Sequence, residues 1–411
     1  MIHDMNKAMR TAMTFALALG LMSNAAFAQD ELWILNEGRF DWTTGEVVEA
    51  PSLGSISMET LTYQELLVFE GEAFATDLEI SGDVAVVVLE NRVVKVDMNS
   101  GQIIADTDLL GAQEAALLAD GTVVVTRGGV DPITYEPLPL SSYLVWLNGE
   151  DLGIEGELFP FEGPSLPSQE VFVMEGVVYV GVNNGWQWGQ EVGRLGRWSP
   201  LEGTYEEFDL GAGAENPVAI HALAGDLYTV NNGDWSSTSV SRISTADLAT
   251  VETSLLSNVT AGCNASAFVG DKLALQISGE TGLRLMDGPS MQWEDEPLNV
   301  GTSAAYSLAV HPGYGWVCSG VTDFESMGEV QIHTSTGEWV ATIPVAIAPG
   351  NLVWRIQSTS NVDVICPLEQ SAEGEWDLGG RCVNQLAPGI PTLRLERLEN
   401  GEVNKVIQWN H

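Results

Sequence analysis

The sequence predicts an all-β fold made of repeated four-stranded units. One phrase recurs, in which an apolar strand meets a Gly or Asp-Gly turn and continues into a second strand rich in Val, Leu and Tyr. The turn glycines are 39, 55, 49, 45 and 43 residues apart, which is the spacing of the blades of a β-propeller. These glycines are Gly82, Gly121, Gly176, Gly225, Gly270 and Gly313.

The repeats predict seven four-stranded blades. Six units span roughly residues 73–347, and a seventh begins with strands at 31–35, 54–58 and 65–69 but lacks a first strand. An open ring would leave unpaired backbone groups at its edge, so we expect residues 351–356 to supply the missing strand.

The end of the chain allows two interpretations. Residues 358–411 form a small C-terminal β extension stapled by a Cys366–Cys382 disulfide, or residues 350–411 form an eighth blade whose outer strands are 393–398 and 405–409. We favour seven blades, with a propeller at residues 29–357.

The N-terminal residues have the order of a secretory signal peptide. Lys7 and Arg10 precede an apolar run at 11–22, and small residues follow at 23–28. We expect cleavage near Ala28-Gln29 and a periplasmic or secreted protein. The apolar run is too short to cross a bilayer and no later run is longer, so we expect no membrane-spanning segment.

The chain is strongly acidic, with 57 Asp and Glu against 16 Lys and Arg and a formal net charge of −41. Such a surface repels phosphate backbones, which excludes nucleic acid as a partner. The acidity fits a solvated, self-repelling surface, and it also fits a trap for a cationic ligand or metal.

Strand direction predicts a second disulfide. Cys263 precedes a first strand and Cys318 is placed near the end of the next unit's second strand, so we expect both at the same face and bonded to each other.

Four predicted second strands end in polar, glycine-rich corners that share one face of the ring, which we call the top face. Asn and Gly tolerate the backbone conformation of a strand exit, but turn chemistry does not explain the tryptophans that follow. Packing on a neighbouring loop or contact with a ligand would explain them. The predicted ligand contacts are Asn36, Glu37, Trp42, Arg127, Asn183, Asn184, Trp186, Trp188, Asn231, Asn232, Asp234 and Trp235.

Several phrases resemble the YncE-like propellers common in Bacteroidetes, a group that includes a domain of unknown function opening with a strand and Asn-Glu-Gly. They are residues 33–38, the Val-x-Val-Asp phrase at 94–97, the Asn-Asn-Gly corners, residues 261–263 and residues 348–351. The resemblance covers roughly residues 30–357. It implies a binding module at the cell surface or in the periplasm, in some members one that captures ligand for an outer-membrane transporter.

Catalytic signatures are weak in this sequence. It has no GxSxG, HExxH or phosphate-binding glycine loop, and the histidines after residue 28 are in separate units. We therefore expect a monomeric, non-enzymatic binding module for a small polar or ringed ligand or a cell-surface protein, with no cofactor and with a structural or channel-bound divalent cation left open. The alternatives are an interaction scaffold and a metal-dependent, lactonase-like hydrolase that uses Glu37, Asn183, Asn231 and Asp234.

Overall fold

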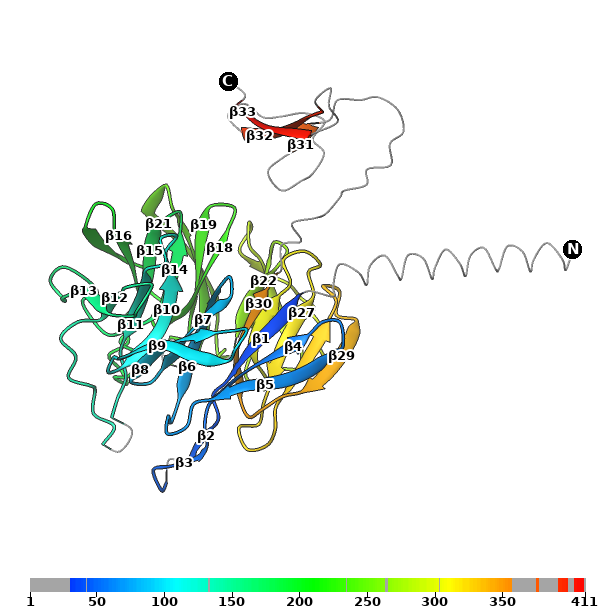
Figure 1. Ribbon diagram of the computed structural model, residues 1–411. Helices are drawn as coiled ribbons and strands as arrows, with labels where there is room; N and C mark the ends of the chain where they lie inside the picture. Colours follow the sequence, from blue (N-terminus) through cyan, green and yellow to red (C-terminus); the bar gives the residue numbers. More distant parts are fainter. Residues whose placement is uncertain are drawn as a thin grey trace, which may run out of the picture. The chain divides into compact units, whose positions relative to one another are not determined.

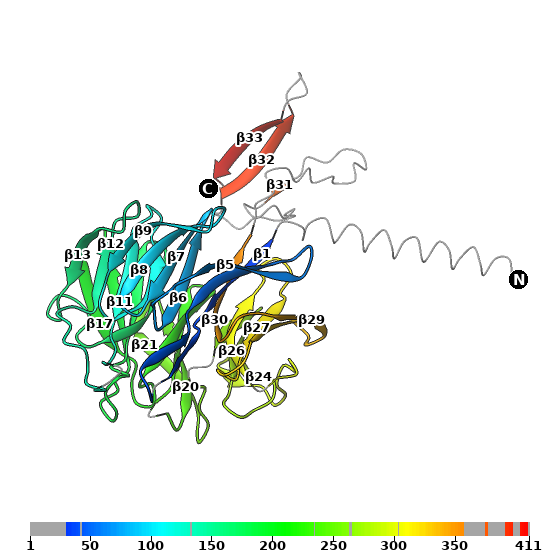
Figure 2. The ribbon, with the colours of Figure 1, turned by 60° about the horizontal axis from the view of Figure 1, so that its bottom comes forward.

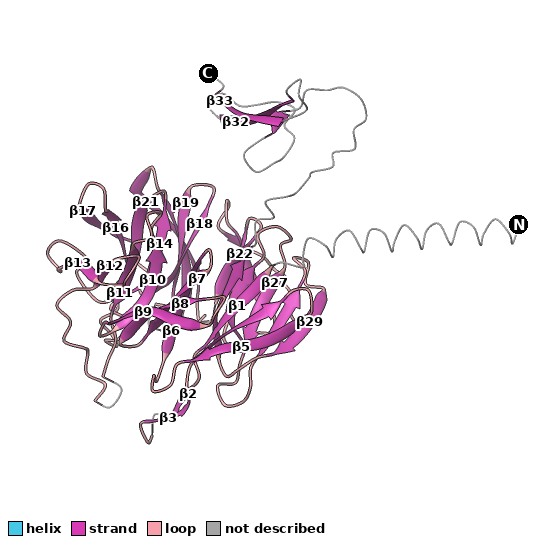
Figure 3. Ribbon diagram, viewed as in Figure 1, coloured by secondary structure: helices cyan, strands magenta, loops and turns pink. Residues whose placement is uncertain are grey.

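The computed structural model is built of strands and turns, with no helix in the part of the chain that it describes (Figure 3). It describes residues 30–41, 43–131, 134–233, 235–262, 265–302 and 304–356, and the backbone of 375–376, 391–397 and 403–409. The chain divides into two compact units, Met1–Gln357 and Ser358–His411. The first unit is a closed seven-bladed β-propeller (Figure 1).

Blades I to III follow one another along the chain, each an antiparallel sheet with its strands in sequence order. Blade I contains β6 (Ala75–Ser81), β7 (Val84–Leu89), β8 (Arg92–Asp97) and β9 (Gln102–Asp108). Blade II contains β10 (Ala112–Leu117), β11 (Val123–Arg127), β12 (Leu144–Leu147) and β13 (Ile154–Leu158). Blade III contains β14 (Ser168–Met174), β15 (Val177–Val182), β16 (Arg194–Ser199) and β17 (Thr204–Asp209).

Blades IV to VI repeat the same order. Blade IV contains β18 (Pro217–Leu223), β19 (Asp226–Asn231), β20 (Thr238–Ser244) and β21 (Asp247–Leu256). Blade V contains β22 (Ser266–Val269), β23 (Lys272–Gln276), β24 (Leu283–Asp287) and β25 (Gln292–Trp293). Blade VI contains β26 (Ala305–Val310), β27 (Val317–Val321), β28 (Glu329–His333) and β29 (Trp339–Pro344).

Blade VII closes the ring from both ends of the propeller, as the sequence predicts. Its order is β30 (Pro349–Arg355), β1 (Glu31–Asn36), β4 (Ser52–Ser57) and β5 (Thr62–Val68). β30 pairs antiparallel with β1, and the two strands lie side by side in Figures 1 and 2. The hairpin of β2 (Arg39–Asp41) and β3 (Glu46–Glu49) extends from the loop after β1.

Closure by β30 rules out the eight-blade alternative. The first and second strands of the seventh blade are already paired, so the ring holds no gap for another blade. In the second unit, β31 (Glu375–Trp376), β32 (Pro391–Arg397) and β33 (Val403–Trp409) form their own antiparallel sheet.

The burial of each strand follows its place in the ring. Second strands such as β7 and β15 have a neighbouring blade on each face, so five successive residues are buried and their sequences are continuously apolar. Outer strands such as β9 consist of exposed and half-buried residues, with none buried. This pattern explains why the sequence shows short apolar runs and little alternation in the second strand of each repeat.

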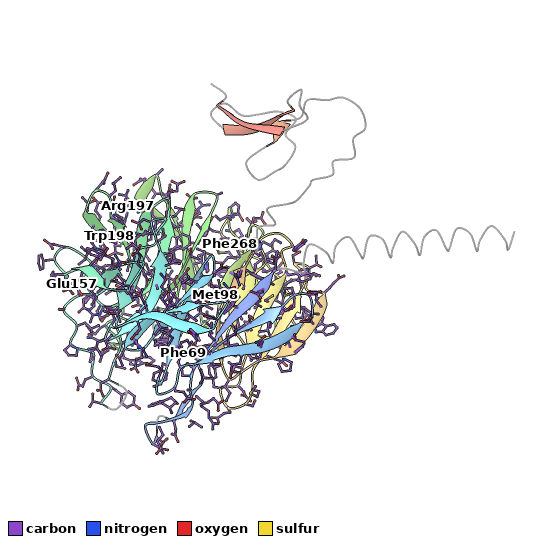
Figure 4. The ribbon with its side chains drawn as sticks, viewed as in Figure 1. Phe69, Met98, Glu157, Arg197, Trp198 and Phe268 are labelled. Carbon is purple, nitrogen blue, oxygen red and sulfur yellow. The ribbon has the colours of Figure 1, made fainter. Side chains whose placement is uncertain are left out.

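The hydrophobic core consists of seven clusters, one between each pair of neighbouring blades. Phe69 and Met98 in Figure 4 belong to the cluster between blades VII and I, and Trp198 belongs to the cluster between blades II and III. Ring closure therefore completes two of the seven interfaces, because β1 and β30 contribute to the clusters on either side of blade VII.

Candidate functional site

The top face carries the long connections of the propeller, and the opposite face carries tight turns. On the top face, residues 37–51, 128–143, 183–193 and 232–237 join second to third strands in blades VII, II, III and IV. Each of these connections follows a second-strand residue that pairs with the start of a first strand, for example Asn36 with Pro349 and Asn231 with Pro217. The predicted polar corners therefore do share one face.

The asparagines at the strand ends are buried braces. Asn36 is fully buried, and its Nδ2 donates to the hydroxyl of Tyr63 at 3.0 Å and to Ser52. Asn231 occupies the equivalent place in blade IV, where its Nδ2 donates to Ser239 Oγ at 3.0 Å. Both amides bond the second strand to the third, and the bond from Asn36 to Tyr63 extends to the fourth strand.

The three remaining corner asparagines also bond within the protein. Asn183 Nδ2 donates to the backbone oxygen of Pro217 at 3.3 Å, which joins blade III to blade IV. Asn184 has a φ of +50° and donates to the backbone oxygen of Gln190 at 2.9 Å. Asn232 donates to a backbone carbonyl of the next blade. Their use as ligand contacts stays a prediction, and the geometry adds that their amide nitrogens already have protein partners.

Arg127 anchors the base of its loop in the same way. Its Nε donates to the backbone oxygen of Leu110 at 3.0 Å, and a terminal nitrogen donates to Ser142 Oγ at 3.1 Å. These bonds tie both ends of the 128–143 connection to blade II.

The tryptophans that the structure describes divide into packed and accessible side chains. The Trp186 ring lies against Gly128, where a Cβ would overlap it, so it joins the corners of blades II and III. Trp188 is 77 % exposed, and its ring centroid is 6.2 Å from that of Trp235. Trp42 and Asp234, which the sequence also indicates, lie outside the described residues.

Trp235 is the tryptophan that faces the centre of the ring. It lines a cavity of about 430 Å³ at the top of the central channel. Its φ is +66°, and its Nε1 is buried with no hydrogen-bond partner among the described residues. The backbone at Trp235 is therefore held in an unfavourable conformation that keeps this residue at the cavity wall, with the indole N–H itself buried.

The cavity receives side chains from the first strands, from the loops that precede them, and from the loops after the second strands of blades VII and IV. Rings are supplied by Phe74, Trp235 and Tyr306, and amides by Gln113 and Gln169. Carboxyl groups are supplied by Glu37, Asp77, Glu114 and Glu170, while none of the lining residues that the structure describes is Lys or Arg. The wall combines flat apolar surfaces, amide donors and acceptors, and acids.

Three of the acids occupy one register position in successive blades. The first strands of blades I, II and III each contain an irregularity at Asp77, Glu114 and Glu170. Asp77 Oδ2 accepts a hydrogen bond from the Ala115 amide of the next blade at 2.8 Å. Glu114 and Glu170 likewise accept from backbone amides of the following blade, at Val171 and Ile220, so each acid reaches across to its neighbour.

These carboxyl groups are held in the channel without a neutralising base. Burial raises the pKa of Asp77 to about 6 and that of Glu114 to about 8, and it holds the pKa of Glu170 well above its usual range. Glu114 and Glu170 are hydrogen-bonded to each other, which requires one of the two carboxyl groups to carry a proton. At neutral pH the channel holds both carboxyl protons and acceptor oxygens.

Glu37 joins the channel to a second cavity. Its Oε2 accepts a hydrogen bond from the hydroxyl of Tyr306 at 3.0 Å, and burial raises its pKa to about 8. Glu37 and Phe74 also line an adjoining cavity of about 710 Å³ beside the β2–β3 hairpin. That hairpin is held by the Arg39–Glu325 ion pair at 2.8 Å. Of the predicted contacts, Glu37 and Trp235 are brought to the same cavity.

Sequence reasoning missed most of the channel wall. Asp77, Glu114 and Glu170 each stand five to seven residues before a turn glycine, a recurrence that is visible in the repeat alignment. In the sequence alone these three acids look like surface charges, because only the closed ring shows that first strands line a channel. A further cavity of about 870 Å³ opens on the opposite face between blades I to III and holds none of the predicted contacts.

Two histidines, one beside the cavity and one on the opposite face, form hydrogen bonds within the protein. His221 Nε2 is 2.7 Å from Ser266 Oγ, and burial lowers its pKa to about 4, so it is neutral. On the other face, His311 Nε2 is 3.1 Å from Asp30 Oδ2, and its Nδ1 accepts from two backbone amides. No group of three His, Cys, Asp or Glu residues in the described part is arranged to hold a metal ion.

The predicted Cys263–Cys318 disulfide is corrected by the structure. Cys318 is a free, buried thiol in the cluster between blades VI and VII. It lies at the beginning of β27, paired with Ala309, and therefore far along the strand from the top face. The prediction placed it at the wrong end of its strand. Cys263, Cys366 and Cys382 lie outside the described residues, as does the predicted signal peptide at 1–28.

The chain is therefore a seven-bladed β-propeller whose top face carries a cavity lined by aromatic rings, amides and acids. The chain is similar to the β-propeller domain of Cps50 (Swd1) from Myceliophteria thermophila, with a TM-score of 0.52 and 11 % identity over 73 % of this chain and 97 % of that one. It is also similar to a putative 6-phosphogluconolactonase from Bacteroides fragilis, with a TM-score of 0.53 and 12 % identity over 79 % and 98 %.

At these identities the likeness shows the fold alone. No protein-family model and no curated protein matches the sequence. The distant lactonase match does not favour the hydrolase alternative. In addition, Asn183 and Asn231, two of the four groups that alternative requires, bond to backbone and strand side chains. No helix among the described residues is long and apolar enough to cross a membrane.

Proposed function

We propose that this protein is an exported, non-enzymatic binding module that captures a small polar ligand with a flat or ringed part. The ligand binds in the cavity at the top of the central channel, which we call the mouth. The observation that carries the proposal is the cavity of about 430 Å³, whose wall brings three aromatic rings and two amides together from separate blades. Its volume lies at the lower end of the range for small-molecule sites, which are about 300–1,000 Å³.

The construction of the mouth supports binding. Phe74, Trp235 and Tyr306 come from the loops and first strands of three blades, and the buried corner asparagines fix the strand ends around them. A rigid scaffold that presents rings limits the entropy lost on binding. The resemblance to YncE-like propellers extends the proposal to a periplasmic or cell-surface setting, where the module could deliver its ligand to an outer-membrane uptake system.

The proposal is tested by titrating the protein with monosaccharides, nucleosides and aromatic amines while following tryptophan fluorescence. Saturable quenching that is lost in Trp235→Ala and kept in Trp188→Ala supports it. Trp188 is the matched control, because it is an accessible tryptophan in contact with Trp235 that does not line the cavity. If no compound gives saturable quenching, or if both variants bind like wild type, the proposal is wrong.

A further inference from the structure

The charged and titratable side chains around the mouth determine which class of ligand the proposed site can bind. Glu37, Asp77, Glu114 and Glu170 line the cavity from the loop after β1 and from three first strands. The other titratable groups on its wall are Tyr306 and His221. His221 is neutral because burial lowers its pKa to about 4, so no described group on the wall offers a positive charge to a ligand.

The adjoining cavity adds to the same imbalance. It is lined by Glu37, Asp41 and Glu325 and by a single base, Arg39, which is already paired with Glu325 at 2.8 Å. Glu79 lies on β6 two residues after Asp77, and burial, followed by the charges of Asp77 and Glu114, raises its pKa to about 8. Among their described lining residues, the two cavities therefore offer no unpaired positive charge to a negative ligand group.

Aromatic rings stand beside these acids. Phe74 and Tyr306 line the cavity with Glu37, and Tyr306 donates its hydroxyl to that carboxyl group at 3.0 Å. Trp235 adds an indole whose N–H has no partner among the described residues. Proteins bind organic ammonium groups against aromatic rings, since the ring faces attract the cation. A neighbouring carboxyl group adds a hydrogen-bond acceptor for the ammonium group.

We propose, resting on the function proposed above, that the ligand of this mouth is an organic cation in which an ammonium group adjoins a flat apolar part. The ammonium group lies against Glu37 and the channel carboxyl groups, and the flat part lies on Trp235 and Phe74. Because burial keeps Glu37 and Glu114 largely protonated at neutral pH, binding of the cation releases protons.

The test uses three probes that share one ring and differ in their head group: phenethylamine, 2-phenylethanol and 3-phenylpropanoate. Isothermal titration at pH 6 and pH 8.5 measures affinity, and titration in buffers of different ionisation enthalpy counts released protons. We expect the ammonium probe to bind at least tenfold more tightly than the alcohol, to gain affinity at pH 8.5, and to release protons. The carboxylate probe should not bind.

Variants locate the effect. Glu37→Gln keeps an acceptor for Tyr306 and should lower the preference for the ammonium probe at least tenfold at pH 8.5, while binding of the alcohol stays within twofold. Glu175→Gln makes the same change in an exposed turn on the opposite face and should alter neither. Should Glu37→Gln fail to fold, Glu114→Gln tests the same preference.

Two results would overturn the inference. Equal or tighter binding of 2-phenylethanol or 3-phenylpropanoate at the mouth shows that the site does not select cations, while binding itself still supports the proposed function. The inference is also wrong if phenethylamine does not bind at either pH. The proposed function is wrong as well only if the neutral ring compounds of the fluorescence titration also do not bind.

Discussion

Replacing Glu37 by Gln removes a carboxyl group whose ionisation opposes folding at alkaline pH. Burial raises the pKa of Glu37 from 4.5 to about 8, so the folded protein keeps a proton that the unfolded chain releases. The contribution of this group to stability is complete below pH 4.5 and is lost as the pH rises through 8, because the folded-state pKa is the higher one.

The expected size follows from the two pKa values. One pKa unit corresponds to about 1.4 kcal/mol, so ionisation of Glu37 lowers the free energy of unfolding by on the order of 5 kcal/mol between pH 4.5 and pH 9. The buried carboxyl groups of Asp77 and Glu114 act in the same direction. The variant should therefore lose less stability with rising pH than wild type. The melting temperature of the variant minus that of wild type should be roughly 6 °C larger at pH 9 than at pH 5, since a propeller of this length has an unfolding entropy of about 0.7 kcal/mol per kelvin.

Melting followed by tryptophan fluorescence at five pH values from 5 to 9 measures this slope. Glu175→Gln, in an exposed turn, is the control for the loss of one negative charge and should keep the wild-type slope. If Glu37→Gln and wild type lose stability in parallel, Glu37 is not held in a buried environment. The carboxyl groups at the channel mouth would then be ordinary solvated acids.

Three further predictions concern packing and the thiol. Trp186→Ala opens a cavity against Gly128 and should lower stability by about 2–3 kcal/mol without changing ligand affinity, which melting and fluorescence titration together would show. Leu352→Asp places a charge in the cluster between blades VI and VII, so it should lower the free energy of unfolding by more than about 4 kcal/mol. Limited proteolysis should then cleave the variant faster than wild type, and a protease-resistant variant would contradict closure of the ring by β30. Peptide mapping without reductant should find Cys318 alkylated only after unfolding, whereas modification of the folded protein would place this thiol at the surface.

The repeat itself is readable from the sequence because each second strand lies between two blades. Residues 84–89 and 177–182 are therefore short apolar runs that follow a turn glycine, and each was placed correctly. Closure by residues 351–356 was also predictable, since a unit with three strands requires a fourth. The β2–β3 hairpin was not predicted, because Arg39–Asp41 is too short to show a pattern.

The site could be predicted only in outline. The top-face corners follow from strand direction, but the sequence does not show which corner side chains are consumed by local hydrogen bonds. Asn231 and Trp235 are four residues apart, yet one is a buried brace and the other lines the channel. The acids at Asp77, Glu114 and Glu170 each bond to the following blade, and a contact between blades leaves no local residue pattern.

Native mass spectrometry of the protein purified from its own host tests the central claim most directly. We predict that the wild-type protein carries a small molecule of constant mass, that Trp235→Ala purified in parallel lacks it, and that Trp188→Ala retains it. The same mass on Trp235→Ala at the same occupancy would contradict the claim that the ligand is bound in the mouth of the central channel.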